Sequence, residues 1–97
     1  LAVYWHKNGT YINSGDPTSG SSKTGARAVL TPTTPGGFYV FTAGADNTGI
    51  ATIEANFGSP SYAISSGNAD GNGYGNFEYA VPSGYYSLNT KNLAEYG

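Results

Sequence analysis

The sequence has 97 residues, enough for one domain. Its formal net charge is −2, and its four scattered basic residues give no electrostatic footprint for nucleic acid. No stretch approaches the roughly 20 apolar residues of a membrane span. The absence of cysteine excludes disulfides and thiolate metal sites. We therefore expect a small folded domain that neither binds nucleic acid nor inserts into a membrane.

The composition favours an all-β chain with long loops. Fifteen glycines and five prolines interrupt the chain, and runs of strong helix formers are short. Aromatic residues make up 14% of the sequence, nine of them tyrosine, so large rings can build a core. This aromatic content, combined with low net charge, argues against disorder. The composition predicts a β domain with no helix longer than one turn.

The N-terminal residues predict a β-hairpin. Residues 2–7 alternate, with Val3 and Trp5 on one face, and residues 10–13 form the returning strand. Asn-Gly at residues 8–9 is the strongest short hairpin signal, because both residues tolerate positive φ. Residues 14–26 are predicted to form a polar loop, which leads to a short strand at residues 28–30.

Further strands are predicted downstream. Residues 38–43 are apolar on both faces, as in a central strand, and residues 50–57 alternate with Phe57 on the inner face. Residues 61–64 form a candidate short strand, and residues 77–81 form the last clear one.

The intervening and closing segments complete the prediction. Four glycines and three asparagines make residues 65–76 a loop, and Pro-Ser-Gly at residues 82–84 is a turn. Residues 85–93 pack irregularly or as one more strand. The strand spacing predicts a β-sandwich. The alternation places four rings in its core: Trp5, Phe57, Phe77 and Tyr86.

Several short motifs occur in a fixed order along the chain. They are Lys-Asn-Gly at 7–9, Ser-Gly-Asp-Pro at 14–17, Asn-Phe-Gly at 56–58, Phe-x-Tyr-x-x-Pro-x-Gly-Tyr at 77–85 and Leu-Asn-x-x-Asn-Leu at 88–93. This set resembles the C-terminal half of SPRY (B30.2-like) domains, particularly the copies in bacteriophage virion and tail-associated proteins. The resemblance implies an antiparallel β-sandwich, of which residues 1–97 form the second half, with long Gly/Asn-rich loops.

The resemblance leaves part of that domain unaccounted for. SPRY domains have further strands before the one that carries Trp5, so we expect residues 1–97 to be a single SPRY-like unit within a longer chain. The alternative is that neighbouring subunits supply the remaining strands. The insert at residues 59–76 is longer than in animal SPRY domains, which argues against carrying over their peptide-binding surface.

No catalytic constellation stands out, so we expect neither an enzyme nor a cofactor. His6 is the only histidine, and no Gly-x-Ser-x-Gly sequence is present. Glu54 and Glu78 would form an acid–base pair only if their strands were neighbours, and solvent-facing strand carboxylates are commoner. The other four carboxylates are Asp16, Asp46, Asp70 and Glu95.

One loop carries a partial metal-binding pattern. Residues 68–73 place oxygen donors at alternate positions before a glycine, like the first half of a calcium loop. The twelfth position is Tyr79 rather than glutamate. A flexible Asn/Gly loop explains the pattern equally well, and we predict no metal site while leaving calcium binding open.

The best candidates for binding are loop residues, with aromatic rings foremost because they supply rigid amphipathic contact area. The candidate binding-loop residues are Tyr11, Asp70, Asn72, Tyr74 and Tyr85. Tyr74, in the middle of the insert, is expected to be exposed.

The resemblance implies a non-enzymatic structural or interaction module of a bacteriophage particle, in a tail, fibre or capsid-decorating protein. The expected location is the virion. The expected partners are other virion proteins or copies of the chain itself, together with a host-surface glycan or protein. Two alternatives stay open, a cellular-type SPRY module that recognises a peptide and a carbohydrate-binding receptor module.

Overall fold

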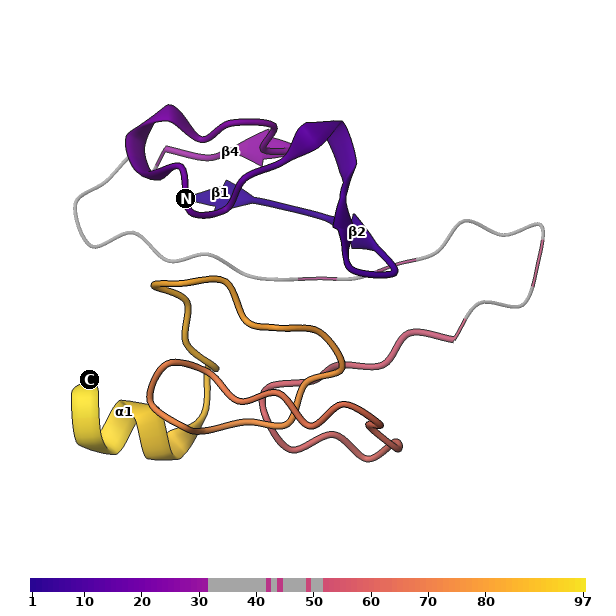
Figure 1. Cartoon of the computed structure of the whole chain (residues 1–97), viewed down its shortest axis with the longest axis vertical. Coiled ribbons are helices and arrows are strands. Elements are labelled where there is room, and N and C mark those ends of the chain that lie inside the picture. Colours follow the sequence, from indigo (N-terminus) through magenta and orange to yellow (C-terminus); the bar gives the residue numbers. More distant parts are fainter. Residues whose placement is uncertain (32–41, 43, 45–48, 50–51) are drawn as a thin grey trace.

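The computed structural model of the chain describes residues 1–31, 42, 44, 49 and 52–97 (Figure 1). These residues form a β-rich structure of loops, small antiparallel sheets and little helix. One sheet pairs β1 (Ala2–Val3) with β4 (Ala28–Val29), and the other pairs β2 (His6–Lys7) with β3 (Thr10–Tyr11). Neither sheet packs face to face against a second one to give a sandwich within the described residues.

The predicted hairpin is confirmed in a shorter form. In its register His6 lies opposite Tyr11 and Lys7 opposite Thr10, so only Asn8 and Gly9 connect the strands. Their φ angles of 49° and 82° match the two positive values that a type I′ turn requires. The dihedral preferences of Asn8 and Gly9 therefore account for the tight turn of this hairpin.

The prediction that the second strand of the hairpin continues through residues 12–13 is wrong. They belong to the 3₁₀ helix η1 (Ile12–Ser14), in which Asn13 and Ser14 have φ angles of 58° and 52°. These left-handed conformations turn the chain away from the strand direction. The following polar loop is confirmed and contains a second 3₁₀ helix, η2 (Gly20–Ser22). The loop leads to β4, which confirms the short strand predicted at residues 28–30.

Most strands predicted after residue 51 are wrong. Residues 52–57 and 61–64 form no strand, and residues 77–81 pair only through one antiparallel bridge, between Asn68 and Phe77. The Asn68 side chain also donates to the carbonyl oxygens of Phe77 and Glu78, at 3.2 and 3.1 Å, beside the backbone bonds of the bridge. Residues 50–51 and nearly all of the predicted strand at 38–43 lie outside the described residues.

The chain ends in a helix that was not predicted. Helix α1 (Thr90–Tyr96) has seven residues, or about two turns, and follows Asn89 as its N-cap. The Asn89 side chain accepts a hydrogen bond from the backbone N–H of Asn92 at 2.8 Å. The turn at residues 82–84 is confirmed by a 3.1 Å bond from the Tyr85 N–H to the Pro82 carbonyl.

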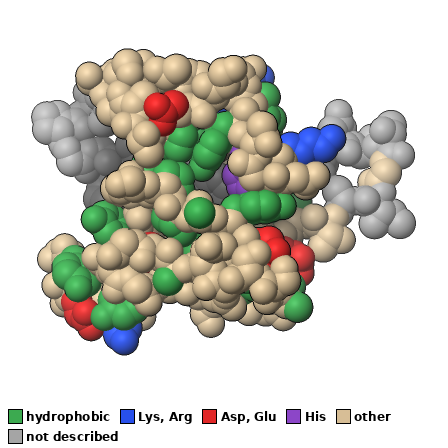
Figure 2. All heavy atoms as spheres, viewed as in Figure 1, with side chains coloured by type: hydrophobic (Ala, Val, Ile, Leu, Met, Phe, Trp, Pro, Cys, Tyr) green, Lys and Arg blue, Asp and Glu red, His purple; other side chains and the backbone are tan. Residues whose placement is uncertain are grey.

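The described residues contain no buried hydrophobic side chain. Three of the four rings predicted to form a core are instead exposed, Trp5 by 59%, Phe57 by 55% and Tyr86 by 57%, and Phe77 is half-buried. No layer of the described residues covers these three rings. Hydrophobic side chains gather between the N-terminal residues and the C-terminal ones below them (Figure 2). No helix within the described residues is long and apolar enough to cross a bilayer.

Candidate functional site

The buried residues are polar, and they centre on the carboxylate of Asp70. Its Oδ1 accepts hydrogen bonds from the backbone N–H groups of Asn72 and Tyr74, at 2.9 and 3.0 Å. Its Oδ2 accepts from the backbone N–H and the hydroxyl of Ser87, at 2.8 and 2.7 Å, and from the amide of Asn92 at 2.8 Å. Five donors therefore surround one carboxylate, which is a strongly stabilising arrangement for an ionised group.

The protonation of Asp70 follows from these donors. Burial alone raises the pKa of its carboxyl group, but the hydrogen bonds from Ser87, Tyr74 and Asn92 together outweigh burial and hold the pKa well below its ordinary range. Asp70 is therefore ionised at neutral pH, and its charge holds the loop at residues 68–73 against the closing segment.

The network continues into helix α1 through asparagine side chains. The Asn92 Oδ1 accepts from the Asn72 side chain at 2.8 Å, and the Asn89 Nδ2 donates to the Ser87 hydroxyl at 2.6 Å. We name the Asp70 network by its five members, Asp70, Asn72, Ser87, Asn89 and Asn92. It joins the insert loop, the closing segment and the start of the helix into one unit.

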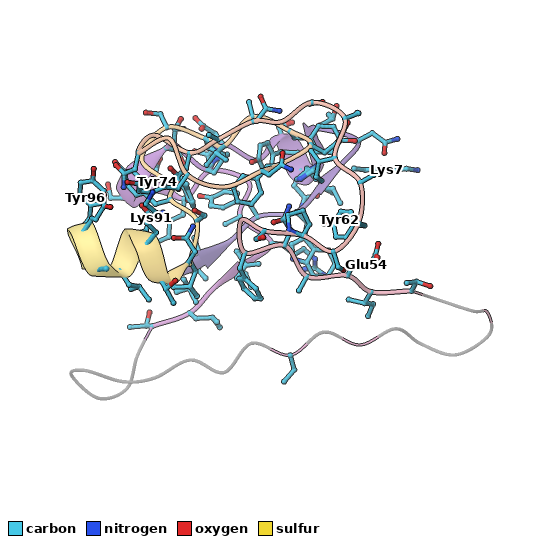
Figure 3. The ribbon with its side chains drawn as sticks, turned by 90° about the horizontal axis from the view of Figure 1, so that it is seen from below. Lys7, Glu54, Tyr62, Tyr74, Lys91 and Tyr96 are labelled. Carbon is cyan, nitrogen blue, oxygen red and sulfur yellow. The ribbon has the colours of Figure 1, made fainter. Side chains whose placement is uncertain are left out.

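The Tyr74 side chain contacts residues of helix α1. It is half-buried, whereas we expected it to be exposed. Its hydroxyl donates to the Glu95 carboxylate at 2.5 Å, and the Lys91 ammonium lies 4.4 Å from the ring centroid. Figure 3 shows Tyr74 and Lys91 side by side at the helix. The hydrogen bond to Glu95, with some burial, raises the pKa of Tyr74 to about 12.

The partial calcium pattern is explained by the Asp70 network. Both carboxylate oxygens of Asp70 already accept hydrogen bonds from the chain, and Asn72 bonds to Asn92. No group of three His, Cys, Asp or Glu side chains that could hold a metal ion is present among the described residues. The Asp70 oxygens thus serve to fold the loop, whereas Asn68 and Asn72 form their side-chain hydrogen bonds through nitrogen.

A groove of about 750 Å³ lies between the N-terminal hairpin and the C-terminal residues. We call it the aromatic groove, after the rings that line it, which belong to Tyr11, Phe57, Tyr62, Phe77, Tyr79, Tyr85 and Tyr86. The Tyr85 hydroxyl donates to the Pro17 carbonyl oxygen at 2.9 Å, which ties the two parts of the chain together. Burial raises the pKa of Tyr11, with a further contribution from nearby Tyr85.

The polar side chains of the aromatic groove are already engaged. Glu78 accepts from the N–H and hydroxyl of Ser65, at 2.8 and 2.5 Å, and these bonds lower its pKa. His6 accepts from the Gly9 N–H at 3.1 Å through Nδ1. Glu54, the proposed acid–base partner of Glu78, does not line the groove. The groove is therefore suited to binding a ligand through its rings.

A second hollow of about 390 Å³ lies beside helix α1. We call it the helix hollow. Its large apolar lining residues are Tyr86, Leu88, Leu93 and Tyr96, exposed by 57, 67, 58 and 64%. Tyr86, Ser87 and Leu88 line both the helix hollow and the aromatic groove, so one short segment separates the two.

The five candidate binding residues fall into two groups. Asp70, Asn72 and Tyr74 lie together at helix α1, and Tyr11 and Tyr85 line the aromatic groove. Sequence reasoning missed Ser87, Asn89 and Asn92 as members of the Asp70 network. The Leu-Asn-x-x-Asn-Leu motif carried a usable signal, since Asn89 is a favoured N-cap residue type and the helix formers Leu93, Ala94 and Glu95 follow it closely.

Comparison with protein-family models, curated proteins and solved structures finds no match to this chain.

Proposed function

We propose that residues 1–97 are a non-enzymatic interaction module of a bacteriophage particle, in a tail, fibre or capsid-decorating protein. The observation that carries the interaction role is the exposure of large apolar side chains around the aromatic groove and the helix hollow. The phage setting is supported by the ordered SPRY-like motifs between residues 7 and 93.

The exposed surface of the chain supports a role in assembly. Among the described residues, Trp5, Leu88 and Tyr96 are 59, 67 and 64% exposed. Large apolar patches on a protein mark sites that contact another molecule. In the proposed function these patches face other virion proteins or further copies of the chain.

We further propose that the domain is a SPRY-like antiparallel β-sandwich when complete. The motifs correspond to the second half of such a domain, and the exposed Trp5, Phe57 and Tyr86 are the rings that a second sheet would cover. Further residues of a longer chain would supply that sheet, or else neighbouring subunits would.

The test is whether the chain is part of purified particles. Phage particles are purified by density gradient from a culture that carries the gene, and their proteins are identified by peptide mass spectrometry. Peptides from residues 1–97 are expected at a constant ratio to the major capsid protein across the gradient peak. Absence from the peak, with the chain present in the lysate, would overturn the proposal.

A glycan-binding receptor module is a second candidate, and one observation favours it. Among the described residues, tyrosine provides five of the seven Phe and Tyr rings that line the groove, and tyrosine presents both a ring face and a hydroxyl to a sugar. A glycan array probed with the chain tests this role, and Tyr62→Ala should abolish any true signal from the groove. A blank array would remove the candidate.

A further inference from the structure

We propose that the aromatic groove takes up an arginine side chain of a partner polypeptide, with the guanidinium group against a tyrosine ring and the Glu78 carboxylate. This inference rests on the proposed interaction function and names the chemistry by which the partner is recognised. A guanidinium or ammonium group is attracted to the face of an aromatic ring within about 6 Å of the ring centroid. Two features of the groove support the inference, the charge of its lining and the exposure of its rings.

The charge that lines the groove is negative and has no counter-charge. Glu78 is the only Asp, Glu, Lys or Arg among the described residues that line the groove. The four basic residues of the chain all belong to the described residues, and none of them lines the groove or pairs with Glu78. His6, which also lines the groove, accepts a hydrogen bond through Nδ1 and is neutral in that state. A cationic side chain of a partner would therefore meet a complementary charge.

The Glu78 carboxylate has room for one more hydrogen bond. A carboxylate offers about four acceptor positions. Its Oε1 accepts from the hydroxyls of Ser65 and Ser66, at 2.5 and 3.1 Å, and its Oε2 accepts from the Ser65 N–H at 2.8 Å. The bonds from Ser65, and then those from Ser66, lower the pKa of Glu78 and keep it ionised. One acceptor position on Oε2 is left for an N–H group of a guanidinium.

Four rings of the lining are exposed to a ligand by about half of their surface. They belong to Phe57, Tyr79, Tyr85 and Tyr86, exposed by 55, 42, 41 and 57%. Tyr79 is also held in place, because its ring meets the His6 ring edge to face at a centroid distance of 5.0 Å. A Cβ atom at position 9 would lie 3.0 Å from the same ring, so Gly9 allows it to pack on the hairpin turn. A ring that is fixed and yet exposed is preorganised to receive a cation.

The chain already forms a contact of this kind at helix α1. The Lys91 ammonium lies 4.4 Å from the centroid of the Tyr74 ring, and the Tyr74 hydroxyl donates to the Glu95 carboxylate. A ring and a carboxylate are combined there with a cation from the same chain. The aromatic groove has the rings and a carboxylate but no Lys or Arg of its own, so the partner supplies the cation.

Arginine suits this lining better than lysine does. Its guanidinium group is planar, so one face can stack on a ring while N–H groups at its edge donate to a carboxylate. The guanidinium is also more weakly hydrated than an ammonium group, and arginine is enriched at protein–protein interfaces. In the groove the guanidinium plane would lie on a tyrosine ring, and an N–H at its edge would donate to Oε2 of Glu78.

The experiment titrates the 97-residue chain with the peptide acetyl-Gly-Ser-Arg-Ser-Gly-amide. Two control peptides carry citrulline or lysine in place of arginine, and citrulline has nearly the same shape as arginine but no charge. NMR spectra of the chain with ¹³C-labelled tyrosine rings give the dissociation constant and show which rings are contacted. We expect the arginine peptide to bind at least about fivefold more tightly than the citrulline peptide, with shifts at Tyr79 and Tyr86.

Three variants test the lining. Glu78→Gln removes the carboxylate charge and Tyr86→Leu removes a ring face, so each should reduce the preference for arginine over citrulline at least about twofold. Glu54→Gln is the matched control, because Glu54 is exposed and does not line the groove. The same loss of charge there should leave the preference unchanged. Tyr86→Leu alters an exposed side chain and still tests the site if Glu78→Gln fails to fold.

Equal binding of the arginine and citrulline peptides by the unaltered chain, or no binding, would overturn the inference. A loss of preference in Glu54→Gln as large as in Glu78→Gln would do the same. A lysine peptide that binds as tightly as the arginine peptide would overturn the choice of arginine. Recovery of the chain in purified particles with no preference among the peptides would leave the proposed function standing and remove this inference alone.

Discussion

At the scale of single residues, Asp70 is the side chain on which the C-terminal half depends most. Its carboxylate accepts five hydrogen bonds from four residues that lie 2 to 22 positions away in the chain. An isosteric amide would present its own N–H groups to some of these donors. The charge of Asp70, as well as its shape, therefore stabilises the fold.

Asp70→Asn should lower the Tm of the chain at pH 7 by more than about 5 °C. The folded-state pKa of Asp70 lies below its unfolded value of about 3.9, so its stabilising contribution is complete above pH 3.9 and is lost progressively as the pH falls from there through the folded-state pKa. The Tm difference between the two chains should thus shrink in acid, as measured by circular dichroism between pH 7 and pH 2.

The matched control is Asp16→Asn. Asp16 is exposed, and its carboxylate accepts two hydrogen bonds, both from Thr18 only two residues away. The same chemical change there should shift the Tm by less than half as much. Equal shifts for the two variants would contradict a special role for the Asp70 network.

Tyr74 and Glu95 provide a second prediction at this scale. Glu95→Gln should bring the pKa of Tyr74 from about 12 down towards the ordinary value of about 10, because the hydrogen bond to a carboxylate is its main cause. In the unaltered chain the interaction stabilises the fold below pH 10 and is lost as the pH rises towards 12. NMR titration of the ¹³C-labelled tyrosine rings measures the pKa directly, with Tyr74→Phe identifying the signal. A pKa that stays near 12 in Glu95→Gln would exclude the hydrogen bond as the cause.

At the scale of elements, helix α1 is too short to be stable alone and depends on its cap. Asn89→Ala removes the bond from Asn89 to the Asn92 N–H and should lower the free energy of unfolding by about 1 kcal/mol in urea titrations. Asn89→Ser retains a capping oxygen and should cost less than half of that. A similar loss in both variants would show that the side-chain bond to Ser87, rather than the cap, is responsible.

The elements also show which features a sequence can predict. The hairpin depends on two adjacent residues, Asn8 and Gly9, whose conformational preference is local, and its prediction is confirmed. A strand at residues 77–81 needs a partner elsewhere in the chain, and alternation alone cannot supply one. The Asp70 network joins residues up to 22 apart, so the burial of Ser87 and Asn92 was not visible in their local sequence.

At the scale of the whole molecule, polar groups are buried and apolar ones are exposed. Within the described residues Asp70, Ser87 and Asn92 are buried. Large aromatic and leucine side chains around the aromatic groove and the helix hollow are instead exposed to solvent. A single-domain protein ordinarily reverses this arrangement. The inversion makes sense if the Asp70 network holds a surface in shape for another polypeptide, which then covers the apolar side chains.

This inversion predicts that the isolated chain binds apolar dyes while it is folded. The fluorescence of 8-anilinonaphthalene-1-sulfonate should rise when the folded chain is added, since the two hollows expose apolar surface. Replacing Tyr86 and Leu88 together by serine should reduce the rise at least about twofold, because both side chains line both hollows. Leu1→Ser is the control, since Leu1 is 55% exposed but lines neither hollow. Dye binding that survives the double change, or that falls equally with Leu1→Ser, would place the exposed apolar surface elsewhere and leave the two hollows without a role in binding.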